Sequence, residues 1–181
     1  MQVRVILYRN KTGKCIFVFG LFFLLSKLTT VIMQNLFQPE SATGIIMRIA
    51  RLQPSAKSLW GKMNVSQMLA HCKAPLQVAL GDKNLKHSFI GWLFGKTAKK
   101  QMLKEAPFKR NLPTDASFVV RDERNFSLEQ DELLNLIKRF SETEPETVAA
   151  RVHPFFGKMT TDEWGILQWK HLDHHLKQFG V

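Results

Sequence analysis

Apolar residues recur at intervals of three and four in four segments of this chain, and this helical period constrains the fold more than any other sequence feature. The first segment runs from Ala42 to Gln53 and ends before Pro54. The second begins after Asn64, a good N-cap residue, and stops at Gly81. We expect Pro75 to bend or shorten this second helix, because proline has no N–H for the helical ladder.

The two later segments each open with a capping box. Ser127 to Gln130 marks the start of the third helix, and Thr160 to Glu163 marks the start of the fourth. The fourth is expected to run to about Gln178, with Gly180 as its stop. We expect no significant strand anywhere in the chain, so the sequence predicts an all-α protein.

The connection between the second and third helices is long, from Gly81 to Phe126. A structureless loop of that length is uncommon in a compact domain. We therefore expect an accessory helix over Phe89 to Leu103 and an extended strap over Pro107 to Phe118. This organisation predicts a four-helix bundle with one long crossover between its second and third helices.

Residues 1–32 differ from the rest of the chain. Four basic residues precede an uncharged apolar run from Cys15 to Ser26, which is the layout of a secretory signal. Extending the run to Met33 gives a weaker membrane anchor, and a third interpretation is that translation naturally starts at Met33. The domain is expected over residues 33–181. The protein would be cytoplasmic if translation starts at Met33, and otherwise exported or membrane-anchored.

The formal net charge is +11 and invites a nucleic-acid interpretation. Residues 33–110 carry thirteen basic and three acidic side chains, whereas residues 111–150 carry four basic and nine acidic ones. Because the second block can neutralise part of the first within the folded domain, we expect a solvated basic face and no specific nucleic-acid partner. Any association with nucleic acid should be weak and sensitive to salt.

Several familiar motifs are absent or have a plainer explanation. The segment Gly91 to Thr97 is one residue too short for a phosphate-binding loop and follows no strand. Asn64 and Asn125 fit the glycosylation sequon, but both stand where a helix is expected to begin, so capping is the simpler role. Cys72 falls on an apolar helical stripe and is expected to be a buried, inert thiol.

Histidines supply the strongest chemical signal. His171 and His175 are four residues apart on the predicted last helix, so both imidazoles can reach one ion. His71 of the second helix is the natural third ligand, since it lies beside an apolar stripe. Spacing alone leaves two interpretations open: a metal site, or histidines with purely structural roles. Asp173 and His174 could orient ligands, but we expect them to turn away as an exposed helical pair.

Three stretches together resemble a known family: Leu59 to Cys72, His153 to Trp164, and Lys170 to Val181. In this order and at these separations they are similar to uncharacterised bacterial domains of the DinB/YfiT-like superfamily. The resemblance implies an up-down-down-up four-helix bundle. It also implies one divalent metal ion, held by His71, His171 and His175. The sequence does not distinguish zinc, nickel, manganese and iron.

Three neutral imidazoles would leave an ion its full charge, so that it acidifies a bound water or deprotonates a bound thiol. Relatives in the superfamily are similar to transferases and isomerases that use low-molecular-weight thiols. We therefore expect a metal-dependent enzyme acting on a small molecule by thiol transfer or hydrolysis, with such a thiol as a candidate second cofactor. His153, before Pro154, is a candidate catalytic acid or base, although it could instead orient a ligand or stabilise the turn.

The competing interpretation is a non-enzymatic helical module with a basic face and structural histidines. A membrane would be a partner only if residues 1–32 form a genuine anchor. A second copy of the chain is a further candidate partner.

Overall fold

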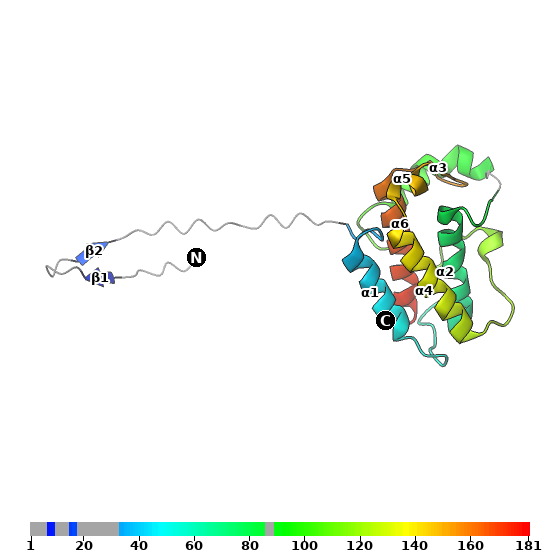
Figure 1. The fold of residues 1–181 in the computed structure, drawn as a ribbon, viewed down its shortest axis with the longest axis horizontal. Coiled ribbons are helices and arrows are strands. Elements are labelled where there is room, and N and C mark those ends of the chain that lie inside the picture. Colours follow the sequence, from blue (N-terminus) through cyan, green and yellow to red (C-terminus); the bar gives the residue numbers. More distant parts are fainter. Residues whose placement is uncertain (1–6, 10–14, 18–32, 86–88) are drawn as a thin grey trace. The chain divides into compact units, whose positions relative to one another are not determined.

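The computed structural model describes residues 7–9, 15–17, 33–85 and 89–181. The chain divides into two compact units, Met1–Ile32 and Met33–Val181, at the boundary expected from the sequence (Figure 1). In the first unit, β1 (Leu7–Arg9) pairs with β2 (Cys15–Phe17) as an antiparallel ladder. Most of the stretch interpreted as a signal or anchor, residues 18–32, lies outside the described residues. No described helix is long and apolar enough to cross a membrane.

The second unit is mostly helical, as predicted. The described part of it contains α1 (Pro39–Ala50), α2 (Val65–Leu80), α3 (Phe89–Met102), α4 (Phe126–Glu142), α5 (Pro145–Ala149) and α6 (Thr161–Gln178), with a 3-10 turn η1 (Ala116–Phe118). Two short strands, β3 (Val152–His153) and β4 (Gly157–Lys158), form an antiparallel hairpin before α6. The expectation of no strands was therefore wrong for these two small ladders.

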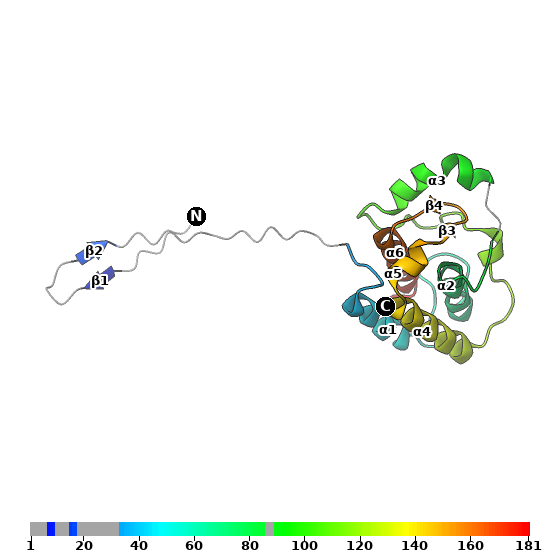
Figure 2. The same cartoon turned by 45° about the horizontal axis from the view of Figure 1, so that its top comes forward.

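The helices α1, α2, α4 and α6 pack around one apolar interior. The helix α2 contacts α4 and α6, and α1 contacts the same two helices on its own side (Figures 1 and 2). Trp164 and Phe140 are the largest side chains with no exposed surface, and both belong to this core. The interior therefore lies between α2 and α6, where the histidines were expected.

Helix caps fix the register of the two helices that carry the histidines. The Asn64 side chain accepts the N–H of Gln67, and the Gln67 side chain accepts the N–H of Asn64. Thr160 and Glu163 make the same reciprocal pair at the start of α6. Both capping predictions are confirmed in these positions.

Three other helix predictions need correction. The cap of α4 is Asn125, whose side chain accepts the N–H of Leu128, so the predicted Ser127 box does not form. The helix α1 begins at Pro39, because proline suits the first helical position, and ends at Ala50, three residues before the expected end. Pro75 does not shorten α2, which continues to Leu80.

Charges of the basic and acidic blocks meet inside the domain. Lys73 of α2 is buried and pairs with Glu129 and Glu132 of α4. Arg139 of α4 also pairs with Asp82, which follows α2, but this pair joins the minority charge of each block. The Lys73 pairs therefore neutralise a charge of the basic block with the acidic block, in the way that the charge distribution predicted.

The long crossover has the two parts expected from the sequence. The helix α3 packs on the hairpin through Gly95, where an added Cβ would overlap the carbonyl oxygen of Phe155. After α3 the chain continues as an extended strap that ends in η1. The Lys170 ammonium donates to the carbonyls of Met102, Lys104 and Ala106, which anchors the start of this strap to α6.

Two glycines in helix interiors should respond oppositely to alanine. Gly44 of α1 has nothing within 4 Å of an added Cβ, so Gly44→Ala should raise the free energy of unfolding by about 0.5–1 kcal/mol. Gly95→Ala should lower it, because the backbone of Phe155 must move away. Urea unfolding of both variants measures the difference. Equal stabilisation by the two substitutions would contradict the close packing of α3 on the hairpin.

Candidate metal site

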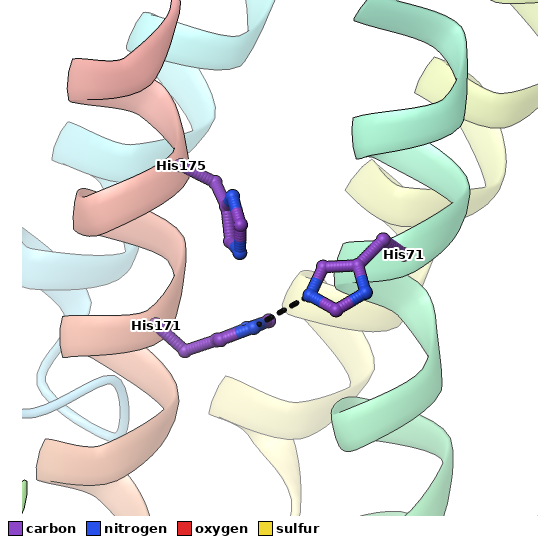
Figure 3. Close-up of side chains that lie close together, drawn as sticks. All are labelled: His71, His171 and His175. Atoms are coloured by element: carbon purple, nitrogen blue, oxygen red, sulfur yellow. Dashed lines mark hydrogen bonds between the residues drawn. The ribbon is translucent and has the colours of Figure 1, made fainter. Parts of the chain in front are cut away.

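Three imidazoles converge between α2 and α6. His71 comes from α2, and His171 and His175 come from successive turns of α6 (Figure 3). One ligating nitrogen from each lies within 4.8 Å of the other two. The Nε2 atoms of His71 and His171 are 3.1 Å apart. The structure thus brings together the three residues that the sequence singled out as ligands.

The outer nitrogens of two of these rings already have partners. His71 Nδ1 lies 2.9 Å from the carbonyl oxygen of Phe118 and, as an N–H, donates to it. His175 Nδ1 lies 2.8 Å from Oε1 of Gln178, whose Nε2 donates to the carbonyl of Trp60. Since a neutral imidazole carries one proton, these bonds leave Nε2 of His71 and His175 as lone-pair acceptors.

His171 completes the cluster, but one of its two ring nitrogens has no hydrogen-bond partner among the described residues. Its Nδ1 is buried and has no hydrogen-bond partner in the described part of the chain. Its Nε2 faces the Nε2 of His71, and two lone pairs cannot approach to 3.1 Å without a proton or a cation between them. An ion bound at Nε2 would place the proton of His171 on Nδ1. Oε1 of Gln168, three residues earlier on the same helix, is a buried acceptor that likewise lacks a partner there.

The histidines of the cluster are held in their neutral form. Burial lowers the pKa of His71, against the effect of its bond to the Phe118 carbonyl. Burial also lowers the pKa of His171 well below its usual value, with further lowering by His175 and His71. For His175, burial is again the main cause and lowers the pKa to about 3. Neutral imidazoles are the form that binds a metal, so the site is prepared at neutral pH.

The donor set fits a divalent transition metal. Two nitrogens bound to tetrahedral zinc at about 2.05 Å lie about 3.3 Å apart, close to the separation between His71 and His171. Imidazole suits zinc, copper, iron and nickel alike, so the ligands do not select one metal. The second bonds of His71 and His175 match the outer partners that metal-bound histidines normally have.

A group of aromatic and cationic side chains lies beside the cluster. The ring of His174 is 5.1 Å from that of His175 and 5.7 Å from that of Trp60. Burial lowers the pKa of His174, Asp173 raises it, and His71, Lys177 and Arg110 lower it further. His174 is therefore half-buried at the edge of the site, not exposed as expected.

Asp173 also differs from the expectation. It is buried and accepts from Arg48 of α1 at 2.8 Å and from Lys177 of α6 at 2.8 Å. Its position on α6 points it toward α1, because one step along a helix rotates a side chain by about 100°. The residue ties α1 to α6 and is not one of the three grouped ligands.

His153 lies in the β3–β4 hairpin and is not grouped with the three histidines. Its Nδ1 accepts the N–H groups of Phe155 and Phe156, each at 3.1 Å. Its ring packs against Trp164, two helical turns before His171. These contacts correspond to the turn-stabilising role that the sequence left open, and no described contact connects His153 to the cluster.

The structure adds groups near the cluster that the sequence analysis missed. They are the Gln178 side chain, the backbone carbonyl of Phe118 and the Trp60–Arg110 pair. Cys72, in contrast, is buried as predicted, and burial raises the pKa of its thiol, which removes it as a nucleophile.

The fold and site together define a helical domain with a buried three-histidine cluster between two of its helices. The chain belongs to the DUF1569 family of proteins of unknown function, whose family model matches residues 34–180. No curated protein and no solved structure matches the chain. The family match begins where the second compact unit begins, so the domain and the family cover the same residues.

The pH dependence of stability should reveal the turn role of His153. Burial lowers its pKa to about 4, so folding favours the neutral ring. Its contribution to stability is complete above about pH 6.5, the unfolded value, and is lost as the pH falls toward about 4. His153→Asn keeps an acceptor for the turn and does not titrate. Urea unfolding between pH 7 and pH 4.5 should therefore show a shallower loss for this variant, by about 1 kcal/mol or more at the acid end. If the free energy of unfolding falls equally with pH in His153→Asn and in the wild type, the stabilising role of the neutral His153 ring is contradicted.

Proposed function

We propose that residues 33–181 form a metal-dependent enzyme domain. In this proposal His71, His171 and His175 hold one divalent ion, and the reaction is thiol transfer or hydrolysis with a small thiol or water as nucleophile. The observation that carries it is the convergence of three neutral imidazole nitrogens within 4.8 Å. Two of the rings are already oriented by second hydrogen bonds, as metal ligands are.

The residues of the chain have distinct tasks in such a reaction. Neutral ligands leave the charge of a bound ion undiminished, and when bound it would supply the acidity that deprotonates a thiol or a water molecule. The Phe118 carbonyl and Gln178 keep the protons of His71 and His175 on the outer nitrogens. Met68 and Leu172, on the same two helices as the histidines, are buried in the apolar core.

The proposal extends to the fold type. The four long helices around one core, with the crossover Gly81 to Phe126, support an up-down-down-up four-helix bundle of the DinB/YfiT-like kind. In helical bundles, metal sites are built in the core from side chains on facing helices. His71 on α2 and the pair on α6 follow that pattern.

One observation favours the enzyme over a module with structural histidines. Buried polar groups that serve only stability are normally hydrogen-bonded, yet His171 Nδ1 has no partner in the described residues. A proton on His171 Nε2 would bridge the 3.1 Å to His71 Nε2 but would leave the Nδ1 atom of His171 buried without a partner there. With an ion at Nε2 the proton lies on Nδ1, and the buried Oε1 of Gln168, three residues earlier on the same helix, lacks a donor in the described part of the chain.

Removal of single ligands should cost the metal and not the fold. In the full chain, purified without a histidine tag, elemental analysis should find about one divalent transition metal per protein. We expect His71→Ala, His171→Ala and His175→Ala each to lose most of it, because three ligands are the minimum for such a site. Circular dichroism should be unchanged, since caps and the apolar core specify α2 and α6.

His174→Ala is the matched control on the same turn of α6. It should retain most of the metal, because His174 is outside the grouped ligands. Loss of metal from His174→Ala with retention in His175→Ala would refute the ligand assignment. If the wild-type protein is metal-free, does not take up added zinc and is not stabilised by it, the non-enzymatic module with structural histidines is favoured.

Gln178 should tune the affinity of the site without binding the ion. Gln178→Met keeps the volume but removes the acceptor for His175 Nδ1 and the bond to Trp60. Metal affinity, measured by competition with a chelator, should fall about 10–100-fold. Gln130→Met is a suitable control, since Gln130 also links a helix to a backbone carbonyl, that of Ile49. Equal effects of the two variants on affinity would argue against an orienting role.

A further inference from the structure

A second cluster, formed by Trp60, His174 and Arg110, adjoins the metal site and has no task in the function proposed above. The Arg110 guanidinium carbon lies 4.3 Å from the centre of the Trp60 ring, a close cation–π contact. The Trp60 ring meets His174 edge-on, and His174 packs against His175. The Trp60 carbonyl is also bound by Gln178, which in turn binds His175. Arg110 is therefore connected through Trp60 to His175 of the candidate metal site, once by way of His174 and once by way of Gln178.

The strap that carries Arg110 is held in place on both sides. Before Arg110, Lys170 binds the carbonyls of Met102 and Ala106 at 2.9 and 2.8 Å, and its ammonium lies 4.9 Å from the Phe108 ring. After Arg110, the Phe118 carbonyl is bound by His71. The guanidinium is thus presented at a defined place although its side chain is exposed.

The charge around this cluster is positive and uncompensated. Stacking on Trp60 uses the face of the guanidinium and leaves its N–H edges free to donate. No carboxylate of the described residues pairs with Arg110. Asp173, the acid between the two ligands of α6, is already paired with Arg48 and Lys177. An anion is the ligand that such an arrangement attracts.

We propose that Arg110, stacked on Trp60, is the subsite for an anionic group, a carboxylate or a phosphate, of a low-molecular-weight thiol whose sulfur lies at the three-histidine cluster. The guanidinium fork would bind two oxygens of that group, and the Trp60 ring would fix the plane of the fork. This inference rests on the thiol form of the proposed function and names its substrate class: an anionic thiol, not a neutral one. The separation of Arg110 from the histidines by Trp60 and His174 requires several bonds between the sulfur and the anion.

Two pairs of thiols test the subsite with the metal-loaded full chain. Glutathione is compared with its diethyl ester, and 4′-phosphopantetheine with pantetheine, so that each pair differs in one kind of anion. Titration calorimetry should show at least one anionic member binding about tenfold or more tighter than its partner without that anion. Arg110→Gln should remove that preference and leave the affinity for pantetheine, which is uncharged, unchanged. Lys109→Gln, which alters an exposed neighbour outside the Trp60 contact, should keep the preference.

The results also distinguish failure of the anion subsite at Arg110 from failure of the proposed metal-dependent function. A preference in the glutathione pair identifies a carboxylate, and one in the pantetheine pair identifies a phosphate. With metal content near one per chain, equal binding within both pairs, no thiol binding, or no effect of Arg110→Gln overturns the subsite and leaves the metal site standing. A chain that takes up no metal overturns the proposed function, and the inference with it.

Discussion

The approach of His71 to His171 is the constraint on which the rest of the site depends. Their Nε2 atoms are 3.1 Å apart because α2 and α6 pack directly against each other. Burial in an apolar core disfavours charge on either ring, so the space between the two nitrogens must hold either the single proton of a neutral His171 or a cation. In the function proposed above a cation takes that place, because it binds neutral imidazoles and lets the proton of His171 move to Nδ1.

The crossover is bound to the same two helices that form the site. Lys170, the residue before His171, holds the start of the strap, and His71 holds the Phe118 carbonyl at its end. A segment that lacks its own helical period therefore acquires a fixed path from α2 and α6. The same bonds that orient a ligand also position the aromatic and cationic side chains beside it. For this reason a change in the strap should be felt at the metal site and not only at the surface.

The sequence predicts the parts of this structure that are coded locally. The caps at Asn64 and Thr160 and the spacing of His171 and His175 are local patterns, and the structure contains each of them. The sequence offers two caps for the start of α4, Asn125 and the Ser127 capping box, and the structure uses Asn125; both are good cap residues, so only packing decides between them. Gln178 and the Phe118 carbonyl could not be found in this way. A carbonyl is present at every residue, and its pairing with a histidine 47 positions away follows only from the tertiary fold.

The acid beside the ligands shows why three histidines, and not a mixed set, form the cluster. Asp173 lies between His171 and His175 in sequence, but one helical step turns it toward α1, where Arg48 and Lys177 neutralise it. A carboxylate at the ion would offset part of the ion's charge and weaken its effect on a bound thiol or water. Because the carboxylate of Asp173 is held in salt bridges with Arg48 and Lys177, the cluster carries no negative charge. In the proposed function the full charge of a bound ion would then act on the substrate, which accords with a cationic arginine, and not an acid, at the edge of the cluster.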